Sequence, residues 1–96
     1  MTKVLVVDDE EVILEVLEAY FKKEGWFVDF ASNGLEALKK AKHERPDIMI
    51  LDLMLPDISG EEVCRLIRKE SNVPIIMLTA KSAEDDLING IGYRGG

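Results

Sequence analysis

The chain has 96 residues, which is room for one small domain around a single core. Its composition, 47% hydrophobic and 32% charged, is typical of a globular protein and too apolar for a disordered one. Nineteen acidic and twelve basic residues give a net charge of -7, which disfavours direct binding of nucleic acid and suits a cation or a partner with a basic surface.

The sequence also lacks the signals of a secreted or membrane protein. The single Cys64 excludes an internal disulfide and a cysteine-rich zinc site. No apolar run approaches the roughly 20 residues of a membrane helix. Asp8 and Asp9 interrupt the first apolar run before it reaches the length of a signal peptide. We therefore expect a cytoplasmic protein with no membrane contact.

The first strand is predicted at Val4–Val7, where consecutive apolar residues indicate burial on both faces of a parallel sheet. A helical pattern follows at Glu10–Glu24, and Gly25 is its expected C-terminal stop. The apolar residues of this helix recur at helical spacing, and we expect them on one buried face. They are Val12, Ile13, Val16, Leu17, Tyr20 and Phe21.

The second strand is predicted at Trp26–Phe30. Asn33 with Glu36 then gives an N-cap signal for a second helix. The apolar positions of that helix are Leu35, Leu38 and Ala41. A third strand is predicted at Ile48–Leu51, where the apolar residues are again consecutive.

Ser59 with Glu62 forms a capping-box sequence ahead of a third helix. The fourth strand is predicted at Pro74–Leu78. Ser82 with Asp85 repeats the capping signal before a fourth helix, which we expect to be short because several glycines follow it. Four strands thus alternate with four helices in one domain over residues 1–96. Right-handed crossovers then predict an α/β fold with helices on both faces of a parallel sheet.

Polar side chains follow three of the predicted strands. Asp8 and Asp9 come directly after the first, Asp52 after the third and Thr79 after the fourth. Ligands of open parallel sheets bind beyond the carboxyl ends of the strands, where the strand order reverses, so we expect these side chains to converge. Packed carboxylates repel one another unless a cation is present. A hard divalent ion with oxygen ligands, Mg²⁺ above all, fits this set.

Each of these residues also has a purely structural interpretation. Asp8 or Asp9 could cap the first helix, and Thr79 could simply end a strand. Asp52 is harder to explain in this way, because it interrupts the apolar stretch Ile48–Leu55, where an unpaired charge is costly.

Three further polar residues receive structural assignments. Asp57 is assigned to a turn at Pro56–Gly60. His43 is assigned to the solvated end of the second helix, and Cys64 to a core or half-buried position on the third.

Three segments, in this order and spacing, resemble the receiver domain of bacterial two-component response regulators. They are VLVVDDE at residues 4–10, DIMILDLMLPDISG at residues 47–60 and VPIIMLTAK at residues 73–81. The sequence around Asp52 is similar to that of the subgroup of response regulators that carry a C-terminal winged-helix DNA-binding domain. The resemblance covers nearly the whole chain, from about residue 3 to about residue 89.

This resemblance implies a flavodoxin-like three-layer sandwich and a phosphoacceptor role for Asp52, with a sensor histidine kinase as phosphodonor. It implies that Thr79 is a switch hydroxyl that turns toward the phosphoryl group, assisted by the Ala80 N–H. It also implies an Mg²⁺ site. The metal ligands that it implies are Asp8, Asp9, Asp52 and the backbone carbonyl of Met54.

The sequence departs from the family pattern after the fourth helix. A complete receiver continues with a fifth strand, a lysine followed by proline, and a fifth helix, whereas here no Lys-Pro pair follows and Lys81 is too close to Thr79 to be that lysine. We therefore expect a receiver cut short, without the fifth strand and helix. Its exposed edge at Pro74–Leu78 and its Ser82–Tyr93 tail would pair with a second copy in a homodimer or higher oligomer.

Two alternatives stay open at this point. One is a truncated or engineered receiver fragment with no phosphotransfer activity, which the missing lysine favours. The other is a phosphohydrolase with an aspartyl nucleophile. Such enzymes usually carry a second Asp two residues after the first, where this chain has Met54, and this alternative ranks last.

Overall fold

The computed structural model describes residues 1–78, in which strands and helices alternate strictly. The elements are β1 (Lys3–Val7), α1 (Glu11–Lys23), β2 (Phe27–Ala31), α2 (Gly34–Glu44), β3 (Ile48–Asp52), α3 (Gly60–Arg68) and β4 (Ile75–Leu78). The expected fourth helix, the Ser82–Tyr93 tail, Thr79 and Ala80 lie outside the described residues.

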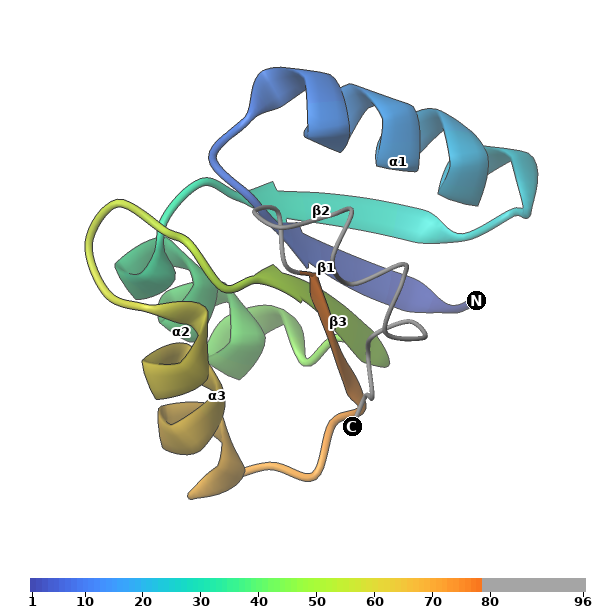
Figure 1. Cartoon of the computed structure of the whole chain (residues 1–96). Coiled ribbons are helices and arrows are strands. Elements are labelled where there is room, and N and C mark those ends of the chain that lie inside the picture. Colours follow the sequence, from blue (N-terminus) through green and yellow to red (C-terminus); the bar gives the residue numbers. More distant parts are fainter. Residues whose placement is uncertain (79–96) are drawn as a thin grey trace, which may run out of the picture.

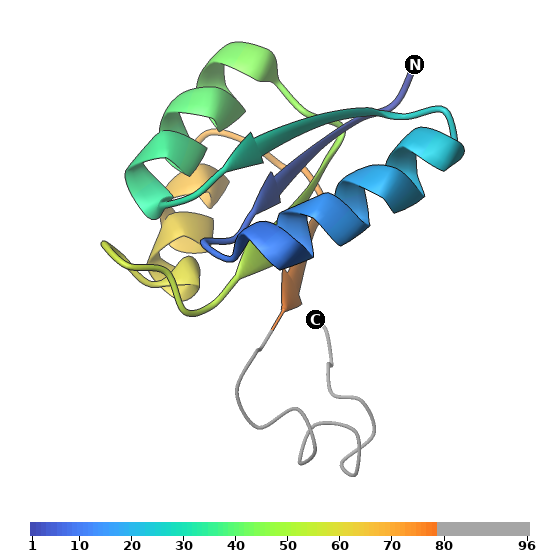
Figure 2. The ribbon, with the colours of Figure 1, turned by 90° about the horizontal axis from the view of Figure 1, so that it is seen from above.

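The strands form one parallel sheet in the order β2-β1-β3-β4. Helix α1 covers one face of this sheet, and α2 and α3 cover the other (Figures 1 and 2). The order reverses between β1 and β3, because β2 lies on one side of β1 and the later strands lie on the other. The predicted flavodoxin-like α/β fold is confirmed.

The core has one half on each side of the sheet. Alternate residues of β1 and β3 point to opposite faces, so both strands are buried on two sides, as predicted. The half under α1 contains Val4, Val6, Phe21 and Ile50. The half under α2 and α3 contains Leu5, Val7, Ala31, Ala37, Met49, Leu51, Val63 and Ile67.

The two outer strands are less buried than β1 and β3. Phe27 on β2 and Ile76 on β4 are both exposed. Each of these strands pairs, within residues 1–78, with only one neighbouring strand. The two-sided burial predicted for the first and third strands therefore does not extend to β2 and β4, which are the outer strands of the described sheet.

The buried face of α1 also differs from the prediction. Leu14, Leu17 and Phe21 contact the core, whereas Val12 and Val16 are 68% and 61% exposed. Tyr20 is exposed as well. The six predicted residues span about half of the helix circumference at 3.6 residues per turn, which is wider than the stripe that one sheet face covers.

The ends of α1 lie close to their predicted positions. Glu10 and Glu24 are its caps, and Gly25 has a φ of +85°, the left-handed conformation that ends a helix. The ring of Trp26 stacks on Phe21 with centroids 5.0 Å apart. β2 begins at Phe27 and ends at Ala31, one residue later at each end than predicted, so Trp26 precedes the strand.

The caps of α2 and α3 are only partly as expected. Asn33 Oδ1 accepts the Glu36 N–H at 2.8 Å, and Ser59 Oγ accepts the Glu62 N–H at 3.1 Å, so both N-caps are confirmed. The capping box of α3 is half formed, because the Glu62 carboxylate bonds Arg65 instead of reaching back. Leu35, a predicted apolar-face residue of α2, is exposed.

Two minor assignments agree with the structure. Cys64 is half-buried beside the core under α2 and α3, and His43 is exposed in the last turn of α2. Over the described residues, no helix combines the length and the apolar character that crossing a membrane requires.

Candidate functional site

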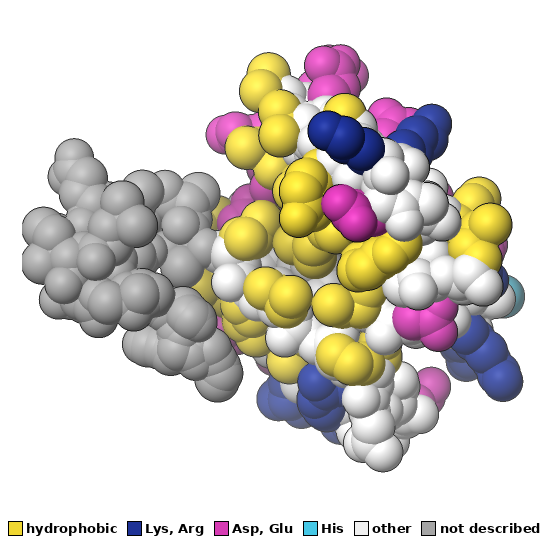
Figure 3. Space-filling view, turned by 90° about the vertical axis from the view of Figure 1, so that its right-hand side faces the viewer, with side chains coloured by type: hydrophobic (Ala, Val, Ile, Leu, Met, Phe, Trp, Pro, Cys, Tyr) yellow, Lys and Arg dark blue, Asp and Glu magenta, His cyan; other side chains and the backbone are white. Residues whose placement is uncertain are grey.

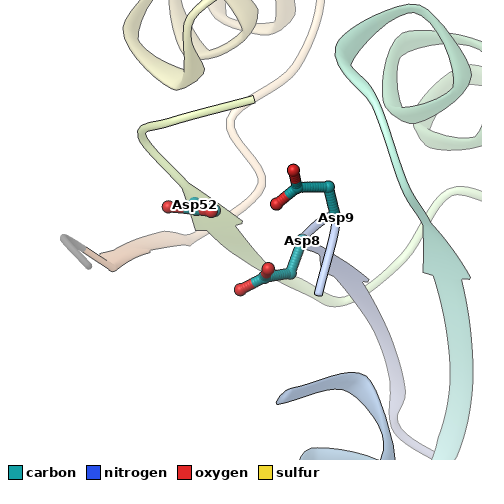
Figure 4. A group of neighbouring side chains, drawn as sticks. All are labelled: Asp8, Asp9 and Asp52. Atoms are coloured by element: carbon teal, nitrogen blue, oxygen red, sulfur yellow. The ribbon is translucent and has the colours of Figure 1, made fainter. Parts of the chain in front are cut away.

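The candidate site lies where the strand order reverses. Val7 pairs with Leu51 at the last step of the register between β1 and β3. Asp8 and Asp52 are the next residues after this pair, so the pairing geometry itself brings them together. Asp9 follows on the same rim, and Figure 4 shows the three carboxylates gathered beside the ends of β1 and β3.

These three side chains share one small space. Asp8, Asp9 and Asp52 each offer a carboxylate oxygen, and the three oxygens lie within 4.8 Å of one another. Asp8 is 5% exposed and Asp52 is 3% exposed, whereas Asp9 is open to solvent. The cluster therefore has a buried floor and one accessible side. Thr79, the fourth polar residue expected here, lies outside the described residues.

The interpretation of Asp8 or Asp9 as a helix cap is wrong. The N-cap of α1 is Glu10, and its side chain makes no capping hydrogen bond. Asp8 Oδ1 instead accepts the Glu10 N–H at 2.9 Å, and the Asp8 N–H donates to the Ala31 carbonyl at 3.0 Å. These bonds fix Asp8 between α1 and β2 with its carboxylate in the cluster.

Asp52 is fixed by its own loop. Its Oδ1 accepts the Met54 N–H at 3.1 Å, which sets the orientation of the carboxylate. The next residue, Leu53, donates its N–H to the Leu78 carbonyl of β4 at 3.1 Å. Asp52 is thus held at the end of β3, and the residue after it is hydrogen-bonded to β4.

Burial raises the pKa of both inner carboxyl groups. For Asp8, the Glu10 N–H opposes this effect, while the negative charges of Asp52 and Asp9 add to it. For Asp52, the Met54 N–H opposes it, and the charges of Asp9 and Glu10 add to it. Negative charge is therefore concentrated where water solvates it poorly, and a cation among the three carboxylates would relieve the repulsion.

The donor set fits a hard divalent cation. Carboxylate oxygens and water are the ligands that Mg²⁺ prefers, and Mg²⁺ usually binds through one or two carboxylates while it keeps several waters. The three converging oxygens and the accessible side at Asp9 meet both needs.

Asp57 makes contacts that the sequence did not predict. Its two carboxylate oxygens accept the Gly34 N–H at 2.7 Å and the Leu35 N–H at 2.9 Å. The assignment of Asp57 to a local turn alone is therefore incomplete, because the residue joins the β3–α3 loop to the start of α2. The first N–H groups of any helix need acceptors from outside the helix, so the sequence indicates that α2 needs such an acceptor. It does not indicate which residue supplies it.

Gly60 is a second residue whose role was missed. A Cβ atom there would lie 2.8 Å from the Leu53 Cα and would clash with the Asp52 carbonyl oxygen. Because both neighbours are backbone atoms, they have little freedom to move aside. The start of α3 approaches the end of β3 this closely only because residue 60 has no side chain.

Comparison with known proteins gives consistent matches. Residues 4–94 match the response regulator receiver domain family. The response regulator TrrA of Thermotoga maritima, solved in complex with Mg²⁺–BeF, is 48% identical with a TM-score of 0.80, over 86% of this chain and 73% of that one. TrrA in complex with the histidine kinase ThkA matches with 43% identity and a TM-score of 0.82, over 100% of this chain and 76% of that one. The chemotaxis response regulator CheY4 of Vibrio cholerae is 34% identical with a TM-score of 0.81, over 94% and 78% of the two chains.

Proposed function

Because this chain belongs to the response regulator receiver domain family, we propose that it accepts a phosphoryl group on Asp52 from a sensor histidine kinase, with Mg²⁺ as cofactor. The observation that carries the proposal is the cluster of three carboxylate oxygens within 4.8 Å at the reversal of strand order. TrrA has been solved both with a histidine kinase and with Mg²⁺–BeF. Beryllium fluoride shares the tetrahedral shape and negative charge of a phosphoryl group. The TrrA complex therefore supports the proposal that this chain accepts a phosphoryl group.

In the proposed reaction, the Asp52 carboxylate is the nucleophile. Its Oδ1 is held by the Met54 N–H, and we assign the other oxygen, Oδ2, as the attacking atom. A bond forms between that oxygen and phosphorus while the bond from phosphorus to the donor histidine nitrogen breaks, and the histidine keeps the electron pair and takes up a proton. The product is an acyl phosphate on Asp52.

The metal ligands in this proposal are Asp8, Asp9, Asp52 and the backbone carbonyl of Met54. Bound Mg²⁺ would offset the negative charge of the phosphoryl oxygens. Asp8 and Asp52 are positioned by strand register, and Asp9 lies on the open side. The Thr79 hydroxyl and the Ala80 N–H, which lie outside the described residues, are proposed as the switch groups that respond to the phosphoryl group.

Labelling with acetyl phosphate and Mg²⁺ tests the phosphoacceptor. Wild type should gain one acid-stable, base-labile phosphoryl group by mass spectrometry, and Asp52→Asn should gain none. Asp47→Asn is the matched control, because it makes the same change just before β3, at the end away from the cluster, where Asp47 accepts the Lys3 N–H. Equal labelling of the Asp52 variant would place the nucleophile elsewhere. Failure of wild type to label would favour the fragment without phosphotransfer activity.

We also propose that two copies of the chain associate through β4. Within residues 1–78, β4 pairs only with β3, and Ile76 on it is 50% exposed. Hydrophobic side chains also gather across the centre of the face that looks to the right in Figure 1 (Figure 3). An unpaired strand edge that carries an exposed apolar side chain such as Ile76 favours pairing with another chain.

Light scattering coupled to gel filtration tests this association. The expected result is a homodimer or higher oligomer whose share rises with protein concentration. Ile76→Lys should shift the equilibrium toward monomer, because a charge on the edge strand opposes pairing. A monomer at every concentration would contradict the association without affecting the phosphoacceptor proposal.

Two finer assignments rest on the sequence alone. We place the protein in the cytoplasm, which the single Cys64 and the lack of a long apolar run support. We place it in the subgroup of receivers whose output is a winged-helix DNA-binding domain, which the resemblance around Asp52 supports. The net charge of -7 supports a division of labour in which this chain does not itself bind DNA. Absence of a DNA mobility shift with the isolated chain at low salt is the expected result.

A further inference from the structure

The loop between β3 and α3 begins and ends at one point of the sheet. The Leu53 carbonyl accepts the Gly60 N–H at 2.9 Å, so the segment 54–59 leaves the sheet and returns to the same residue. The Leu53 N–H in turn bonds the Leu78 carbonyl at 3.1 Å. The base of the loop is therefore fixed, and Met54 is its first residue.

The far side of the loop is tied to α2 through Asp57. Its carboxylate accepts the N–H groups of Gly34 and Leu35, the first two residues of α2, at 2.7 and 2.9 Å. Asn33 Oδ1 takes the N–H of Glu36, the third. Early N–H groups have no acceptor within a helix, and a carboxylate is also attracted to the positive end of the helix dipole. The two hydrogen bonds hold the pKa of the Asp57 carboxyl below its usual range, with the Gly34 N–H as the main cause.

Packing reinforces this tie at the adjacent residue. A Cβ atom on Gly34 would lie 2.9 Å from the Ile58 Cδ1, so the Ile58 side chain occupies the space that a side chain at residue 34 would need. Ile58 and Leu55 also pack against the core under α2 and α3. Two consecutive loop residues, 57 and 58, therefore contact the same turn of α2.

We propose that Asp57 is a positioning residue for the metal site, holding the loop so that the Met54 backbone stays beside Asp52. The inference rests on the proposed function, in which the Met54 carbonyl is a metal ligand. Met54 lies three residues before Asp57, and its N–H bonds the Asp52 carboxylate. A shift of the loop tip would thus disturb both the carbonyl of Met54 and the orientation of Asp52.

Mg²⁺ titrations of the full chain, followed by amide chemical shifts, test this role. Asp57→Ala should weaken Mg²⁺ binding by about tenfold, the scale at which residues behind metal ligands act. Asp57→Asn keeps one acceptor oxygen and should recover part of the affinity. Asn33→Ala is the matched control, because it removes a cap from the same helix end without releasing the loop. Its Mg²⁺ affinity should stay within about twofold of wild type, although the loss of this cap lowers its stability.

The amide spectra supply a second readout. In Asp57→Ala, the Gly34 and Leu35 amide protons should move upfield as they lose the carboxylate, and the Met54 amide should shift with them. Unchanged Mg²⁺ affinity in Asp57→Ala and Asp57→Asn would overturn the inference, as would an equal loss in Asn33→Ala. Absence of Mg²⁺ binding by wild type would instead contradict the proposed function itself and this inference with it.

Discussion

Asp8 and Asp52 directly follow Val7 and Leu51, the last residues that pair between β1 and β3, and both residues are almost fully buried. Each accepts a backbone N–H from the residue two positions later, Glu10 for Asp8 and Met54 for Asp52. The two loops that begin at these residues therefore present their carboxylates in the same way. Burial and neighbouring negative charges raise both pKa values, so the ionised carboxylates lower the stability of the folded state.

Asp52→Asn should increase the free energy of unfolding in the absence of Mg²⁺, by about 0.5–2 kcal/mol, the usual range for one stabilising substitution. The folded-state pKa of Asp52 lies above its ordinary value of 3.8, so ionised Asp52 destabilises the fold at every pH above the folded pKa. This cost disappears as the pH falls through the folded pKa and below 3.8. The advantage of the variant should therefore be largest at about pH 7 and should close toward about pH 4.

Denaturant unfolding of both proteins across this pH range, read from the fluorescence of Trp26, measures the difference. Asp47→Asn again serves as control and should follow wild type, because the asparagine keeps an acceptor for the Lys3 N–H. An advantage of Asp52→Asn that does not change with pH would show that charge burial is not its origin.

Mg²⁺ should stabilise wild type and should do so through Asp8. Binding to the folded state alone adds about 2.7 kcal/mol when free Mg²⁺ is about 100 times its Kd. Asp8→Asn removes one anionic ligand and should abolish most of this gain. We expect weak binding, visible as shifts of the Asp9 and Met54 amides. Flat shifts up to millimolar Mg²⁺ would argue against the metal site, whereas Trp26 precedes β2, at the opposite end of the sheet, and should report little.

Gly60→Ala should destabilise the fold by about 1–3 kcal/mol, the usual cost of overpacking. The new Cβ would meet the backbone of Asp52 and Leu53, so the site should be distorted and Mg²⁺ binding weakened. Gly25→Ala is an informative control. Its Cβ would meet open space, yet its φ of +85° makes the substitution cost about 1–2 kcal/mol. Equal Mg²⁺ affinity in the two variants would contradict a specific role for the close contact at Gly60.

The sequence was sufficient for the order of elements and for the meeting of Asp8, Asp9 and Asp52. Consecutive apolar residues mark β1 and β3 as buried parallel strands, and residues that follow parallel strands lie on one rim of the sheet. The contact of Asp57 with α2 could not be predicted, because it joins residues 22 and 23 positions apart through loop geometry. Local patterns specify which N–H groups need an acceptor but not the residue that supplies it.

The orientation of α1 is the other feature that the pattern left undetermined, and it gives a direct test of the core. Leu17→Ala should cost about 2 kcal/mol, because Leu17 packs against the half of the core under α1 and its loss leaves a cavity. Val16→Ala, one position away on the exposed side, should change stability by less than about 0.5 kcal/mol, since Val16 is 61% exposed. Alanine also has the higher helix propensity, which offsets any small loss of contact. Thermal unfolding of the two variants at equal protein concentration separates these expectations. A larger loss for Val16→Ala than for Leu17→Ala would contradict the assignment of Val16 to the exposed face of α1 and of Leu17 to the core.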